Sequence, residues 1–163
     1  MRKVLFPTLI LLSIAAMIFS FISCGTTDNP EATGTFRAEF TGDFSKVMEG
    51  DSYFSLEPSG INGIIIIRLD ESETSYLRLV FPNPSPTEIV LEPGTYTIVT
   101  NLGNNITDEV LVDYVENGIS FKASSGSVRV GISKETQLAG DIINASFPLL
   151  SSTCNGNFNA KPE

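Results

Sequence analysis

The stretch "GIIIIRLDESETSYLRLVF", Gly63 to Phe81, decides the fold class of this 163-residue chain. It begins with a continuous β-branched run, which is typical of a central strand covered on both faces. It ends in an alternation, with Leu77, Leu79 and Phe81 on one face and Tyr76 and Arg78 on the other. The polar residues between these two parts predict a loop. The stretch therefore predicts two strands and no helix.

Similar short strands, separated by turn residues, continue to both sides. The segment "TFRAEFT" (35–41) alternates, and so does "SVRVGIS" (127–133). Asn117-Gly118 is the strongest short hairpin signal, Pro93-Gly94 predicts a type II turn, and Ser125-Gly126 predicts a further turn. Many short strands at this spacing predict an all-β fold, an antiparallel β-sandwich. A β-barrel is the alternative, because periodicity does not separate the two.

The N-terminus has the order of charges and apolar residues found in secretory signal peptides. Arg2 and Lys3 are followed by an almost wholly apolar run from Val4 to Ile22, and then by polar residues after Gly25. This order predicts a cleaved signal helix over residues 1–23. An uncleaved membrane anchor is the alternative, because the run is long enough to cross a bilayer.

The junction "FISCG", Phe21 to Gly25, resembles the lipobox of bacterial lipoproteins. The resemblance implies that Cys24 becomes the first residue after cleavage and carries the lipid that holds the protein at a membrane. It also implies an outer-membrane lipoprotein facing the periplasm or the cell surface, because Gly25 is not the aspartate that signals inner-membrane retention. We expect residues 24–33 to form a flexible tether and residues 34–163 a single β-sandwich domain.

The C-terminal part is similar to small uncharacterised lipoproteins of Gram-negative bacteria. The similarity rests on "LEPGTYTI" (91–98), on the "SGSV" hairpin (125–128) and on a late strand, and it covers roughly residues 90 to 160. The late strand is "GNF" (156–158) or the less regular "GDIINASF" (140–147). These are turn and strand motifs. They imply a fold and an anchoring mode rather than an activity.

Composition limits the function classes. The net charge of −9 disfavours nucleic acid as a partner, because affinity there depends on Lys and Arg meeting phosphates. The chain has no His, so the usual general base is missing. It also has no Trp, so the most common ring for stacking on sugars is absent. With Cys24 acylated, Cys154 has no partner for a disulfide, and we expect it to be buried. We therefore expect a protein that is not an enzyme, with a small hydrolase using paired carboxylates as the alternative.

Two clusters are candidate sites. Tyr76 and Arg78 share a predicted outward face and could bind a ligand, since tyrosine offers a flat ring and a polar tip. Asp70, Glu71 and Glu73 are hard oxygen ligands that could hold calcium, although an acidic hairpin tip exposed to solvent is the simpler interpretation. No cofactor other than calcium is suggested. The predicted role is a binding or structural module at the envelope, with a glycan or an envelope protein as partner and the membrane reached through Cys24.

Overall fold

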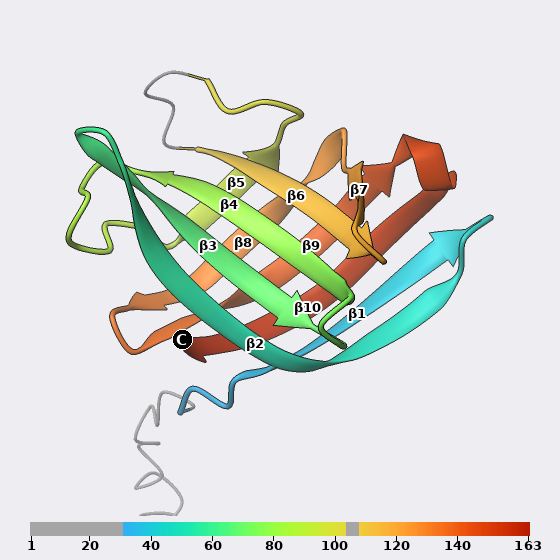
Figure 1. Ribbon diagram of the computed structural model, residues 1–163, viewed down its shortest axis with the longest axis horizontal. Helices are drawn as coiled ribbons and strands as arrows, with labels where there is room; N and C mark the ends of the chain where they lie inside the picture. The colour runs from blue at the N-terminus through green and yellow to red at the C-terminus, as the bar shows by residue number, and fades with distance from the viewer. Residues whose placement is uncertain (1–30, 104–107) are drawn as a thin grey trace, which may run out of the picture. The chain divides into compact units, whose positions relative to one another are not determined.

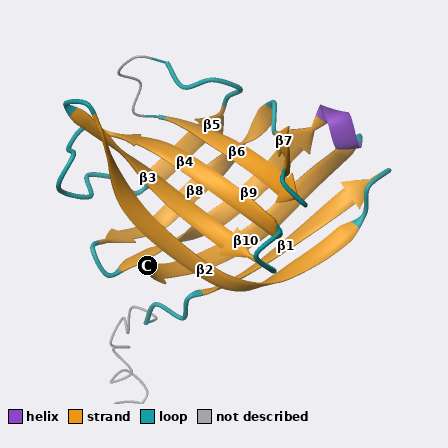
Figure 2. Ribbon diagram, in the orientation of Figure 1, coloured by secondary structure: helices purple, strands orange, loops and turns teal. Residues whose placement is uncertain are grey.

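The computed structural model describes residues 31–103 and 108–163, which belong to one compact unit, Glu31–Glu163. Cys24, the predicted signal helix and most of the predicted tether lie outside the described residues. The strands are β1 (Thr35–Gly42), β2 (Lys46–Ser59), β3 (Asn62–Asp70), β4 (Ser75–Asn83), β5 (Gly94–Ile98), β6 (Glu109–Glu116), β7 (Ile119–Lys122), β8 (Ser125–Lys134), β9 (Gln137–Phe147) and β10 (Ser152–Pro162). A short 3₁₀ helix, η2 (Pro148–Leu150), precedes β10. The described part is all-β, as predicted (Figure 2), and none of its helices could cross a membrane.

The strands close into a barrel rather than stacking as two sheets. Within the described residues, nine strands follow one another around the wall in the order β4-β3-β2-β1-β10-β9-β8-β5-β6, and β6 then pairs with β4 (Figure 1). β7 pairs with the C-terminal half of β6, from Asp113 to Glu116. The β-sandwich prediction is therefore wrong and the barrel alternative is confirmed. The physical reason is the β4–β6 ladder, which joins the two sheet edges that a sandwich would leave open.

The wall is mostly antiparallel. Two short parallel pairs occur within the described residues. The end of β10 lies beside β2 at Tyr53 and Phe54, and Thr97 and Ile98 of β5 lie beside Glu109 and Val110 of β6. A parallel pair needs a connection that returns along the barrel. That connection places β5 between β6 and β8, and no local sequence signal predicts it.

The interior is filled by one face of each strand. The alternation predicted for β1 is confirmed, because Phe36, Ala38 and Phe40 are all buried. The isoleucine run was predicted to be covered on both faces, and this prediction is wrong. In β3, Ile65 and Ile67 point inward, whereas Ile64 and Ile66 lie on the half-exposed outer wall. A barrel has a single buried face, so a continuous β-branched run does not need a cover on both sides.

The turn predictions have mixed outcomes. Asn117 and Gly118 both have positive φ and join β6 to β7, as a hairpin turn of this sequence requires. Ser125-Gly126 forms no turn: β8 begins there, and the pairing with β9 shifts register around Gly126. This β-bulge helps to curve the wall. The type II turn at Pro93-Gly94 is also wrong, because Gly94 starts β5 without a positive φ.

Aromatic rings pack together at one end of the core. The ring of Phe40 lies 5.0 Å from that of Tyr114 and 5.3 Å from those of Phe44 and Phe147, measured between centroids. Cys154 is fully buried, as expected, and burial raises the pKa of its thiol to about 12. The thiol is therefore neutral at physiological pH, and a neutral buried thiol packs as a small apolar group.

Candidate functional site

A groove of about 600 Å³ runs over the outer wall of β2, β3 and β4. Each strand contributes outward-facing side chains, because alternate residues of a strand point to the same face. We name this feature the β2–β4 groove and define it by its lining residues: Tyr53, Phe54, Ser55, Glu57, Ile66, Arg68, Asp70, Tyr76, Arg78 and Glu163. Tyr76 and Arg78, which the alternation placed on one outward face, both line it. The groove therefore brings the two predicted ligand-binding residues together.

Strand register places four polar side chains in one row across the wall. Tyr53 pairs with Arg68, Arg68 with Arg78, and Arg78 with Asp113 of β6. Side chains directly opposite each other in neighbouring strands are close enough to interact. Two arginines therefore stand side by side, with a tyrosine at one end of the row and a carboxylate at the other.

Arg68 is held on both sides. Its Nε donates to Asp70 Oδ1 at 2.6 Å, and this hydrogen bond is the main reason why its pKa is raised above the usual value. Its guanidinium carbon lies 4.1 Å from the centre of the Tyr76 ring, a cation–π contact that fixes the plane of the guanidinium. Tyr76 therefore supports Arg68 with one face of its ring.

Arg78 is held differently. A terminal nitrogen donates to Asp113 Oδ2 at 2.5 Å, while Asp113 is almost completely buried and Arg78 is 42% exposed. Within the described part of the chain, Arg78 Nε and Asp113 Oδ1 are buried and have no hydrogen-bond partner. The contact therefore uses one nitrogen and one oxygen, and not the two-point fork of which this pair is capable.

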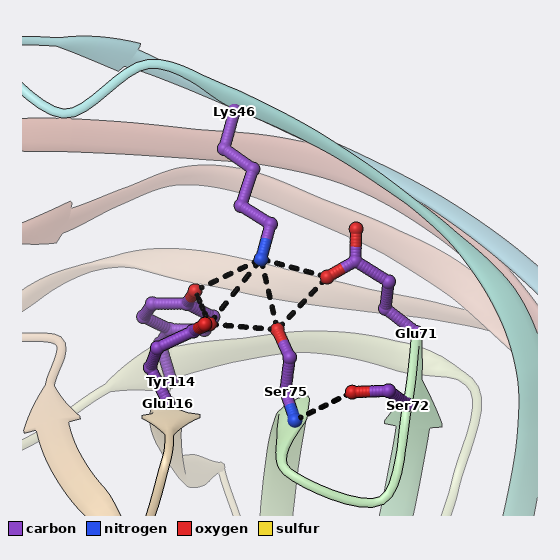
Figure 3. A network of polar contacts seen from close by, with 6 residues as sticks. All are labelled: Lys46, Glu71, Ser72, Ser75, Tyr114 and Glu116. Carbon is purple, nitrogen blue, oxygen red and sulfur yellow. Dashed lines mark hydrogen bonds and ion pairs between the residues drawn. The ribbon is translucent and has the colours of Figure 1, made fainter.

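A second polar cluster lies at the end of the barrel where β1 turns into β2 and β3 into β4. We name it the Lys46 network and define it by Lys46, Glu71, Ser72, Ser75, Tyr114 and Glu116 (Figure 3). Lys46 Nζ is 2.7 Å from Glu71 Oε2 and 3.2 Å from Glu116 Oε2. It also donates to Ser75 Oγ at 2.9 Å and to Tyr114 OH at 3.2 Å. The network connects three separate parts of the wall over the aromatic end of the core.

The pKa shifts in the network reinforce the ordinary charge states. Burial alone would lower the pKa of Lys46, but hydrogen bonds to Glu71, Tyr114 and Glu116 outweigh it and raise that pKa well above its usual value. A hydrogen bond from Tyr114, followed by one from Ser75, lowers the pKa of Glu116. Burial raises the pKa of Tyr114. The ammonium and the Glu116 carboxylate are therefore both charged near neutral pH.

Ser75 and Lys46 are as close as a catalytic nucleophile and its general base, but Lys46 is not in the protonation state that a general base needs. A lysine acts as a general base only when its amine is neutral, and Lys46 is held protonated. The Ser75 hydroxyl is also buried, with Glu71 and Glu116 as acceptors at 2.9 and 2.8 Å. We interpret the network as a structural cap on the barrel.

The predicted calcium ligands have separate partners. Asp70 accepts a hydrogen bond from Arg68, and Glu71 binds Lys46. Within residues 31–103 and 108–163, no group of three or more potential metal-ligating side chains comes together. A calcium site at Asp70, Glu71 and Glu73 stays a prediction from the sequence alone.

Replacing Lys46 with methionine should lower the free energy of unfolding by about 2 kcal/mol at pH 8, because hydrogen bonds to a charged group are lost and two carboxylates are left close together. The cost should shrink at pH 4. The lowered pKa of Glu116 contributes stability above its unfolded value of 4.5, and this contribution disappears as the pH falls through the folded pKa. Urea unfolding at both pH values measures the effect.

Lys134→Met is the matched control, because it removes an exposed lysine at the end of β8. It should change stability by less than about 0.5 kcal/mol at either pH. Equal losses for the two variants would mean that the network contributes no specific stability.

Comparisons of the chain with protein-family models, with curated proteins and with solved structures find no match.

Proposed function

We propose that this protein is a non-catalytic binding module of the cell envelope, with the β2–β4 groove as its ligand site. The supporting observation is that Tyr76 and Arg78 line one groove together with polar side chains from two neighbouring strands. A concave site of a few hundred cubic ångströms with several converging polar groups is typical of ligand binding. The partner is a glycan or an envelope protein.

The charge states support binding over hydrolysis by paired carboxylates. Such hydrolysis needs one carboxylic acid with a raised pKa. Glu71 and Glu116, which share Ser75, are instead bridged by Lys46, and the pKa of Glu116 is lowered. The pair suits a salt-bridge network better than proton transfer.

Tyr76→Ala should strongly weaken ligand binding in a glycan-array experiment, because it removes the ring that contacts Arg68 as well as one wall of the groove. We expect a loss of at least about tenfold in affinity, since stacking and correct orientation are lost together. Ile119→Ala is the control, because Ile119 is an exposed apolar residue that does not line the groove. Unchanged binding by Tyr76→Ala would place the ligand site elsewhere.

We further propose that a lipid on Cys24 holds the barrel at the outer membrane. The support is the lipobox-like junction "FISCG". One acyl chain binds a bilayer only weakly, whereas two or three chains on one residue give stable anchoring.

Cys24→Ala should leave the protein without lipid when it is expressed in a Gram-negative host. Mass spectrometry of the wild-type protein should find Cys24 as the first residue with acyl chains attached, and detergent phase separation should place it in the detergent phase. The variant should keep residues 1–23 and carry no acyl chain. An unmodified Cys24 in the wild type would refute the anchor and leave the groove proposal standing.

A further inference from the structure

The arginine pair of the β2–β4 groove is the least expected feature of the outer wall. Arg68 and Arg78 are direct cross-strand partners, and like charges in such positions destabilise a sheet. The chain carries 10 Lys and Arg against 19 Asp and Glu, so cations are scarce, yet two of them share one groove. Each guanidinium is paired with one carboxylate, Asp70 or Asp113, which offsets the repulsion between the two arginines and leaves their remaining exposed donors available to a ligand.

We propose that the β2–β4 groove binds the carboxylate of an acidic saccharide between Arg68 and Arg78. The inference rests on the binding function proposed above and names its ligand class. A carboxylate and a guanidinium match in shape, because each presents two parallel positions for hydrogen bonds.

The hydrogen-bond inventory of the two arginines leaves donors for such a ligand. Arg68 uses Nε for Asp70, and Arg78 uses one terminal nitrogen for Asp113. Each guanidinium has five N–H donors. Among the described residues, the two terminal nitrogens of Arg68 and the second terminal nitrogen of Arg78 donate to no acceptor. Because both side chains are more than 40% exposed, an incoming carboxylate can reach them.

The surroundings of the pair favour a saccharide over a peptide strand. The floor strands β3 and β4 are hydrogen-bonded along both edges, so a peptide cannot extend the sheet there. Tyr53 and Ser55 offer hydroxyl groups at the sides of the groove, which suits a ligand rich in hydroxyls.

Acidic residues of the groove oppose the proposed ligand: Glu57 and Glu163 line it in addition to Asp70, which is paired with Arg68. The charge of Glu163 adds to that of Asp70 in acting on Arg68. A bound carboxylate would be repelled by Glu163, so neutralising this residue should strengthen binding.

Calorimetric titration of the full chain in detergent with oligogalacturonate, a saccharide with a carboxylate on each sugar, tests the proposal. The methyl-esterified oligomer is the uncharged comparison and should bind at least about tenfold more weakly, because the charged hydrogen bonds are lost. Arg68→Gln should weaken oligogalacturonate binding to a similar extent. Glu163→Gln should tighten it. Sulfated oligosaccharide is the third probe, and tighter binding of sulfate than of carboxylate would overturn the carboxylate assignment.

Arg78 needs a paired variant, because Arg78→Gln alone would leave the buried Asp113 carboxylate without its partner. The double variant Arg78→Gln with Asp113→Asn keeps neutral groups that can hydrogen-bond and should also bind at least about tenfold more weakly. Arg129→Gln is the control, because Arg129 pairs with Asp141 on another part of the wall. It should bind like the wild type.

The outcomes of these experiments distinguish failure of the carboxylate inference from failure of the proposed binding function. Equal binding of the acid and its ester, abolished by Tyr76→Ala but unaffected by Arg68→Gln, would overturn the carboxylate inference and keep the binding function. No binding of any saccharide, charged or uncharged, would overturn the carboxylate inference and leave only an envelope protein as the partner of the groove.

Discussion

Phe40→Ala should reduce the free energy of unfolding by about 4 kcal/mol, as expected when a fully buried aromatic side chain is truncated in a packed core. Phe40 is completely buried and lies among the rings of Phe44, Tyr114 and Phe147. Removing its ring leaves a cavity that strands held in a closed wall cannot easily fill, and it removes several ring–ring contacts. Urea unfolding followed by circular dichroism measures the change.

Phe40→Leu provides the graded comparison. It keeps an apolar side chain in the same place and should cost about half as much, because the cavity is smaller. A loss below about 1 kcal/mol for Phe40→Ala would mean that the interior is loosely packed and relaxes around the truncated residue.

Gly140→Ala should cost about 3 kcal/mol or prevent folding, because a β-carbon at this position has no room. It would lie 2.0 Å from the backbone oxygen of Arg129 on β8 and 3.0 Å from the edge of the Phe158 ring. The backbone of a paired strand cannot move aside without breaking its hydrogen bonds, and overpacking at such a point is costly.

Gly131→Ala is the matched control, because it makes the same substitution in the same β8–β9 hairpin. Its nearest neighbour would be the Ala139 oxygen at 3.9 Å, an ordinary contact, so this substitution should change stability by less than about 1 kcal/mol. Comparable melting temperatures for the two variants would show that the close approach at Gly140 does not constrain the barrel.

Alternation was sufficient to predict the buried face of several strands, but not which strands far apart in the sequence are neighbours. Alternation placed Phe36, Ala38 and Phe40 inside because a period of two is a local property of the chain. The pairing of β4 with β6 joins residues 31 to 41 positions apart in the sequence. It depends on the path of the intervening segment, which no local pattern encodes. The choice between sandwich and barrel depended on this one ladder.

The candidate site was predictable to a similar degree. Tyr76 and Arg78 followed from alternation. Arg68 was missed as a site residue because it follows the isoleucine run, which was predicted to be covered on both faces. A sequence signal for it was nevertheless present. Arg68 and Arg78 are equally distant from Glu73 in the hairpin turn, so a tight hairpin pairs them. Asp113 required the β4–β6 ladder. Lys46 required knowing that three turns meet at one end of the barrel.

The position of β1 has a mechanical consequence. β1 is the first strand of the described unit, and it is hydrogen-bonded to β2 on one edge and to β10 on the other. A pulling force that enters through residue 31 and acts along β1 would stretch both ladders at once, so that their hydrogen bonds must rupture together rather than one after another. A barrel built in this way should resist forced unfolding, by drag or by a tightly held ligand, better than one whose first strand lies at an open edge.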